Sequence, residues 1–141
     1  MSEAHSHQYV EITVDDGKYA LMIQDIHEII KIQDITQIPN SRPHIKGVIN
    51  LRGIIVPVIS LRNRFGLPEL PYDKATRIVV VNLEDDTVGI VVDKVNKVTY
   101  FSQVQPSPVQ SDDISGEFLS GVGVTDDGLV GILKLEEVLH Q

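Results

Sequence analysis

Five groups of neighbouring carboxylates are the part of this sequence best suited to chemistry, because paired carboxylates can act as a general acid and base or hold a hard cation. Three of these groups lie between β-branched segments, where a hairpin must turn, and aspartate is favoured there because it tolerates a positive φ angle. We therefore expect solvated turns rather than a catalytic or metal site. The groups are Asp15-Asp16, Glu84-Asp85-Asp86, Asp112-Asp113, Asp126-Asp127 and Glu136-Glu137.

The other residues that commonly act in catalysis or metal binding form no motif. There is no cysteine, which excludes disulfides, thiolate zinc ligands and a cysteine nucleophile. His5, His7 and His140 lie near the ends of the chain, and His27 and His44 lack a second ligand at the four-residue spacing of a helical metal site. We predict a protein without cofactor or metal, whose function lies in its surfaces. A small β-barrel enzyme that assembles scattered carboxylates is the alternative.

The charge distribution argues against nucleic acid and anionic lipid as partners, because the net charge is −8. No acidic residue lies between Asp34 and Glu69, and this span predicts either a positive patch or ordinary solvated loops. A nucleic-acid-binding SH3-like barrel would need aromatic residues among the basic ones, and the stretch from Arg42 to Arg64 has none. No apolar run is long enough to cross a bilayer, and the N-terminus lacks signal-peptide features, so we expect a cytoplasmic protein without membrane insertion. The basic residues of the span are Arg42, Lys46, Arg52, Arg62 and Arg64.

The elements that must position these residues come from an internal repeat. Residues 8–30 align without gaps with residues 77–99, at an offset of 69. Each copy has two β-branched segments joined by an acidic turn, which predicts a hairpin. After the hairpin the apolar spacing changes from two to three, which suits a short helical turn or an irregular strand end. Aligned apolar pairs include Val10 with Val79, Ile12 with Val81, Leu21 with Ile90, Ile26 with Val95, and Ile29 with Val98.

A second match extends the repeat, since residues 47–61 resemble residues 121–135. We expect one domain over residues 8–141, after a flexible tail at 1–7, built from two halves at roughly 8–70 and 71–141. The regular turn spacing predicts two small barrels or a sandwich. Helices should be few and short, and the candidates are residues 25–30, 61–65 and 135–141.

Arg52 interrupts the apolar run 47–61 and is expected at a turn between two strands. Its planar guanidinium suits a bidentate contact with a carboxylate, either of its own chain or of a partner protein. Pro57, five residues later, predicts a strand edge or bulge because proline cannot donate to a ladder.

The segment "IKGVINLRGIIVPVISLR" (45–62) resembles the CheW family of chemotaxis coupling proteins. So do "IHEII" (26–30), "TRIVVVNL" (76–83), "VGIVVDKV" (88–95) and "FLSGVGV" (118–124). The resemblance implies a mostly β fold of two intertwined five-stranded SH3-like barrels with a few short helices. It also implies a non-enzymatic adaptor that couples chemoreceptors to the histidine kinase CheA, recruited to membrane-associated receptor arrays. A CheW-like module of another two-component pathway is the alternative.

The same resemblance implies which residues meet the partners. A groove between the barrels takes the cytoplasmic hairpin tip of the receptor, and Glu28 and Arg52 match a charged pair important for signalling. The regulatory domain of CheA contacts another face, to which the region from Pro106 to Val109 corresponds loosely. The groove residues are Ile26 and Val98, with Ile29 and Val95 beside them by the repeat, and Gly47, which matches a glycine tied to receptor contact.

Overall fold

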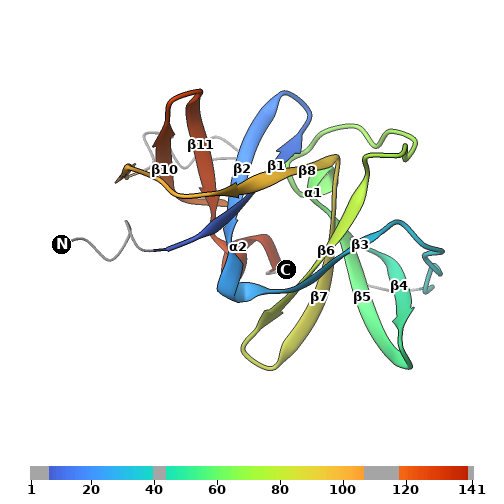
Figure 1. Ribbon diagram of the computed structural model, residues 1–141. Coiled ribbons are helices and arrows are strands. Elements are labelled where there is room, and N and C mark those ends of the chain that lie inside the picture. The colour runs from blue at the N-terminus through green and yellow to red at the C-terminus, as the bar shows by residue number, and fades with distance from the viewer. Residues whose placement is uncertain (1–6, 40–43, 107–117, 140–141) are drawn as a thin grey trace.

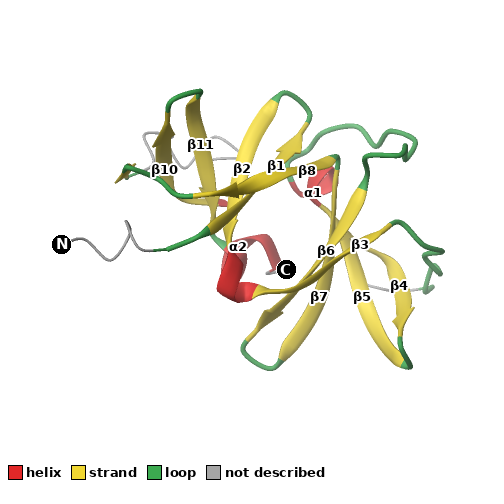
Figure 2. Ribbon diagram, in the orientation of Figure 1, coloured by secondary structure: helices red, strands yellow, loops and turns green. Residues whose placement is uncertain are grey.

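Strands dominate the computed structural model, which describes residues 7–39, 44–106 and 118–139. Sheet A has six strands in the order β8-β1-β2-β11-β10-β9, and sheet B has five in the order β3-β6-β7-β5-β4 (Figure 2). The mostly β fold class with few short helices is thus confirmed. The strands of sheet A are β1 (Tyr9–Val14), β2 (Gly17–Met22), β8 (Lys94–Thr99), β9 (Gln103–Gln105), β10 (Leu119–Thr125) and β11 (Gly128–Leu133). Those of sheet B are β3 (Ile26–Lys31), β4 (Ile45–Leu51), β5 (Ile54–Ser60), β6 (Arg77–Leu83) and β7 (Asp86–Val92).

The two sheets exchange hairpins between the halves of the chain. The β1–β2 hairpin lies in sheet A beside strands β8 to β11 from the second half. Conversely, the β6–β7 hairpin lies in sheet B among β3, β4 and β5. Figure 1 shows this as blue strands among orange and red ones in one sheet, and a yellow hairpin among blue-green strands in the other. Neither sheet is therefore made from one half alone.

The pairing follows the sequence repeat residue by residue. Ile12 on β1 lies opposite Val95 on β8, and its repeat equivalent Val81 on β6 lies opposite Ile26 on β3. Both ladders shift register at the same place, leaving an extra residue on the edge strand, Asn96 on β8 and the equivalent His27 on β3. The parallel pairs β2–β11 and β7–β5 correspond in the same way. The predicted hairpins are confirmed.

Each sheet also curls, and its two edge strands follow one another in the chain. β8 and β9, the first and last strands of sheet A, are separated only by residues 100–102. In sheet B the chain beyond β3 reaches the opposite edge at Thr36, which exchanges backbone hydrogen bonds of 2.9 and 2.8 Å with Val48 on β4. One bent stretch of chain thus runs between the edges of each sheet, as an SH3-like barrel requires.

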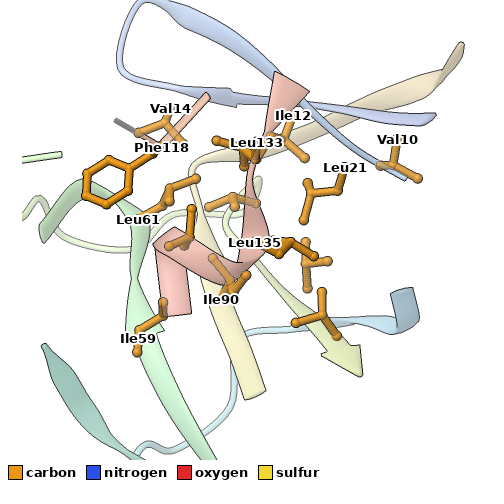
Figure 3. Close-up of a cluster of buried hydrophobic side chains, with 14 of the residues drawn as sticks. Val10, Ile12, Val14, Leu21, Ile59, Leu61, Ile90, Phe118, Leu133 and Leu135 are labelled. Atoms are coloured by element: carbon orange, nitrogen blue, oxygen red, sulfur yellow. The ribbon is translucent and has the colours of Figure 1, made fainter. Parts of the chain in front are cut away.

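A central core joins the sheets. It contains repeat-related side chains from both, including Val10, Ile12 and Leu21 from sheet A and Val79, Val81 and Ile90 from sheet B. Figure 3 shows side chains of β1, β2 and β11 meeting those of β5 and β7. Two smaller cores lie on the other faces, one against each sheet. Burying an aliphatic side chain of this size contributes about 1.5–3 kcal/mol, so the central core holds the exchanged hairpins in place.

Of the three predicted helices, two are confirmed and one is wrong. Helices α1 (Leu61–Arg64) and α2 (Leu135–Leu139) form as expected, and the Ser60 hydroxyl caps α1 by accepting from the Asn63 amide at 3.2 Å. Residues 26–31 are instead strand β3, after a single 3-10 turn at Ile23–Asp25. The three-residue spacing comes from the bulge at His27, which turns Ile26 and Ile29 to the same face of the strand. No helix among the described residues could span a bilayer.

Pro57 lies within β5, which is an inner strand of sheet B and not an edge. It pairs with Val48 on β4, and the parallel ladder to β7 begins only at the next residue, Val58. The proline is tolerated because β5 has a ladder partner on one side only at this point.

A nearly buried arginine ties the exchanged parts together. Arg62 on α1 donates to both oxygens of Asp93, at 2.9 and 2.7 Å, and to the Pro68 carbonyl at 3.1 Å. Asp93 also accepts from the amide of Asp15 in the β1–β2 turn, at 2.8 Å. Burial alone would raise the pKa of Asp93, but the hydrogen bonds from Arg62 and Asp15 outweigh it and hold this pKa below its ordinary value. The ionised pair therefore links α1, the β1–β2 turn and the end of β7.

We expect Arg62→Met to lower the free energy of unfolding by about 3 kcal/mol at pH 7, because it leaves Asp93 partly buried without its countercharge. The folded-state pKa of Asp93 is lowered, so this stabilisation is complete above the ordinary aspartate range and is lost as the pH falls through the folded value. In urea unfolding experiments, the difference in the free energy of unfolding between wild type and variant should therefore become smaller as the pH is lowered. Lys97→Met is the control, since the Lys97–Asp127 pair is exposed and should contribute less than about 1 kcal/mol. An equal loss in both variants would contradict this role of Arg62.

Candidate functional site

Three of the five carboxylate groups lie in solvated turns as expected, whereas Glu136-Glu137 lie in helix α2. Asp15-Asp16, Glu84-Asp85 and Asp126-Asp127 occupy exposed turns between paired strands, and Asp15 and Glu84 have φ angles of 57° and 56°. Asp112-Asp113 lie outside the described residues. Within the described part of the chain, no three histidine or carboxylate side chains are grouped as metal ligands would be.

The expectation of a positive patch in the acid-free span is wrong for the residues that the structure describes. Lys46 contacts Glu69 at 2.9 Å, Arg52 contacts Glu28, and Arg62 contacts Asp93. Arg64 donates to the Glu137 carbonyl at 2.9 Å. Carboxylates from other segments thus offset the charges of Lys46, Arg52 and Arg62, whereas Arg64 is held by an uncharged backbone carbonyl. Arg42 lies outside the described residues.

The four apolar groove residues lie at corresponding places on the two edge strands β3 and β8, and Gly47 lies on β4. Ile26 and Val95 are half-buried and pack against the central core. Ile29 and Val98 lie on the same faces, opposite Val79 and Val10, but are 37% and 51% exposed. We refer to Ile26, Ile29, Val95 and Val98 as the edge-strand surface, because on each of these two strands the central core continues out to solvent. Three hollows on the molecule are lined by other residues.

Arg52 forms a bidentate ion pair with Glu28. Its Nη1 donates to Glu28 Oε2 at 3.2 Å, and its Nη2 donates to Oε1. The hydrogen bonds from Arg52 lower the pKa of Glu28 below its ordinary value, so the carboxylate is ionised at neutral pH. Glu28 is on β3 and Arg52 follows β4, so the pair bridges the two edges of sheet B.

The turn that carries Arg52 is unusual. Arg52 and Gly53 both have positive φ angles, 53° and 89°, as in the two-residue type I′ turns that match strand twist. Asparagine or aspartate is the usual first residue of such a turn, and arginine is disfavoured there. The Asn50 side chain stabilises the turn by accepting from the Gly53 amide at 2.8 Å. The turn therefore presents a guanidinium, 66% exposed, beside the edge-strand surface of β3.

Gly47 is buried beneath the chain that follows β3. A Cβ atom at this position would lie 2.4 Å from the Thr36 carbonyl oxygen and 2.8 Å from Ile35 Cγ2. Only glycine lets the Ile35–Thr36 backbone approach β4 closely enough to make its hydrogen bonds with Val48. Gly47 thus holds the segment that closes sheet B and offers no side chain to a partner.

The expected kinase contact is described only in part. Pro106 follows β9 directly and is exposed. Val109 lies outside the described residues.

Sequence reasoning did not identify Arg62 and Asp93 as partners. Both residues are visible in the sequence, but they are 31 positions apart and meet only because β5 and β7 run parallel, side by side. The one available signal was a lone aspartate directly after an apolar strand.

Comparisons with known proteins agree on one family. The family model described as CheW-like domain matches residues 8–141. The chemotaxis protein CheW of Bacillus subtilis is 40% identical over 133 residues, which cover 91% of this chain and 83% of that protein. The CheW of Helicobacter pylori is 35% identical over 135 residues, covering 95% and 82%. The crystal structure of the scaffolding protein TtCheW from Thermoanaerobacter tengcongensis matches with a TM-score of 0.85 and 35% identity, over 96% of this chain and 93% of that one.

We expect Gly47→Ala to lower the free energy of unfolding by about 1–3 kcal/mol, because the added methyl group must displace the Thr36 carbonyl. Hydrogen exchange should become faster at the amides of Thr36 and Val48. Gly121→Ala is the matched control at the equivalent position of β10, where a Cβ atom would lie 2.9 Å from the nearest backbone oxygen. Gly121→Ala should lower the free energy of unfolding by less, and it should leave the Thr36 and Val48 amides protected from hydrogen exchange. Unchanged protection in Gly47→Ala would refute this role.

Proposed function

Because the chain belongs to the CheW-like domain family, it is a chemotaxis scaffold and not an enzyme, and we propose that it couples chemoreceptors to the histidine kinase CheA. In this proposal it acts in the cytoplasm, at membrane-associated receptor arrays. One surface binds the cytoplasmic hairpin tip of the receptor, and another binds the regulatory domain of the kinase.

The main support for the proposed receptor contact is the edge-strand surface. Ile29 and Val98 are exposed apolar side chains on rigid paired strands, and each continues the row of a half-buried residue, Ile26 or Val95. A helix with an apolar stripe can bury such side chains without rearranging the protein. The half-buried Ile26 and Val95 would then lie at the base of the contact, and the exposed Ile29 and Val98 would touch the helix.

The Glu28–Arg52 pair supports the same proposal from the rim of that surface. The Arg52 guanidinium is two-thirds exposed, so it can keep one contact to Glu28 and still donate to a carboxylate of a partner. Charged groups at the rim of an apolar contact mainly set register and suppress wrong partners. Gly47 contributes indirectly, through the position of the segment that leads away from β3. We propose the region from Pro106 to Val109 as the contact with the kinase.

We expect Ile29→Asp and Val98→Asp each to weaken binding of a receptor signalling fragment at least about tenfold, since each places a charge in the apolar contact. Co-sedimentation with receptor fragment and CheA measures this directly. Both sites are exposed, so the fold should persist, whereas Ile26→Asp would also disturb the central core. Leu129→Asp, an exposed position on β11, serves as the control and should bind normally. Normal receptor binding by both Ile29→Asp and Val98→Asp would remove the edge-strand surface from the proposal.

We expect Glu28→Arg and Arg52→Glu each to abolish receptor-dependent control of kinase activity while the fold is kept. The double variant restores an ion pair with its charges exchanged. If the pair acts by joining the sheet edges, the double variant should regain most of the control; if Arg52 must meet a partner, it should stay inactive. Phosphorylation assays in reconstituted mixtures distinguish these results. Full control in both single variants would refute the role of the pair.

A further inference from the structure

A hollow of about 1000 Å³ lies in sheet B, between the tips of two hairpins. The β4–β5 and β6–β7 hairpins diverge there, and the end of α2 lies near the point where they separate (Figure 1). Ile55 and Pro57 line one wall, ahead of the point at which β5 and β7 begin to pair. Leu139 closes the end, and carboxylates surround the opening, Glu84, Asp85, Asp86 and Glu136.

The equivalent place in sheet A is filled by the chain itself. Residue 47 aligns with residue 121, and the same offset of 74 pairs α1 with α2. In sheet A, Phe65, which follows α1, packs on Tyr19 of β2 with ring centroids 4.9 Å apart, and on Phe118 at 5.7 Å. Arg62 of α1 lies 3.5 Å from Asp15 in the adjoining turn. Three aromatic rings and an arginine therefore occupy the space between the hairpins.

Sheet B lacks each of these groups at the matching position. Val88 stands where sheet A has Tyr19, Leu139 where it has Phe65, and Glu136 where it has Arg62. Glu84 replaces Asp15, so two acids face the hollow where sheet A has an ion pair. Burial raises the pKa of nearby Asp25, and the negative charge of Glu136 adds to this rise. The smaller side chains of sheet B leave the hollow open, and carboxylates surround its opening.

We propose that this hollow binds a segment of a partner protein that carries an aromatic side chain close to an arginine. The ring would take the place that Phe65 fills in sheet A, and it would cover Ile55, which is now 61% exposed. The guanidinium would meet the carboxylates of Glu84 and Glu136, which face the hollow without the arginine that occupies this position in sheet A. An aromatic ring with an adjacent arginine is also the chemistry most enriched where interfaces gain their affinity.

The residues that line the hollow differ from those of the edge-strand surface. The hollow is formed by β5, the β6–β7 turn and α2, whereas the edge-strand surface belongs to β3 and β8. Both can therefore be occupied at once, and the proposal holds whichever partner binds the edge strands.

The test uses the full chain and a probe taken from the filled copy, a capped peptide with the sequence of residues 60–67, SLRNRFGL. We expect saturable changes in the amide NMR signals of Ile55, Thr87, Val88 and Leu139. Peptides with Phe→Ala or with both arginines changed to glutamate, and a scrambled peptide of the same composition, should bind at least about tenfold more weakly.

Variants of the protein complete the test. Ile55→Asp and Glu136→Arg should each weaken peptide binding at least about tenfold, the second by supplying the arginine internally. Leu129→Asp is the matched control, because Leu129 is the equivalent of Ile55 in sheet A and is 66% exposed; it should bind as wild type does. The proposal is overturned if the peptide gives no saturable change up to about 10 mM. A Kd at this concentration corresponds to a binding free energy of only about 3 kcal/mol. It is also overturned if the changes map elsewhere, including around Tyr19 and Phe118, or if Ile55→Asp binds the peptide normally.

Discussion

The exchange of hairpins between the two sheets is the constraint on which the rest of this structure depends. β1 and β2 supply two strands of sheet A, although the rest of that sheet comes from the second half of the chain, and β6 and β7 do the reverse in sheet B. Because the exchanged hairpins also carry much of the central core, neither half can bury its apolar side chains alone. Cooperative folding of the whole domain follows, and Arg62 reinforces it by joining segments from both halves.

The candidate site is a consequence of how the sheets close. Each edge strand carries one bulge, which turns residues three positions apart toward the central core. The inner residue of each pair packs against that core, and the outer one reaches solvent. In sheet B the closing segment depends on Gly47, and the Glu28–Arg52 pair spans the same two edges. The apolar residues of β3, the ion pair and the closing segment thus all depend on the same two edges of sheet B.

The two halves share a backbone plan but use it differently. The β4–β5 turn holds Arg52 and Gly53, while the equivalent β10–β11 turn holds two solvated aspartates. Between the hairpins, sheet A is filled by aromatic rings and an ion pair, whereas sheet B has aliphatic side chains and carboxylates around an open hollow. The repeated backbone plan supplies the fold and the matching edge strands, while the Arg52 turn and the open hollow are found in one copy only.

The sequence by itself determined the class of fold and the family. β-branched segments at a constant offset predict paired hairpins, acidic dipeptides between them predict turns, and the block around Arg52 is distinctive of CheW-like domains. These signals are local or repeated, so periodicity reveals them. Only the tertiary structure shows that residues 26–31 form a bulged strand, that Arg52 pairs with Glu28 and that Arg62 pairs with Asp93. It also shows that the space between the hairpins is filled in sheet A and open in sheet B. Each of these depends on contacts between distant segments, and a single sequence does not show which residues a parallel strand or a sheet edge brings together.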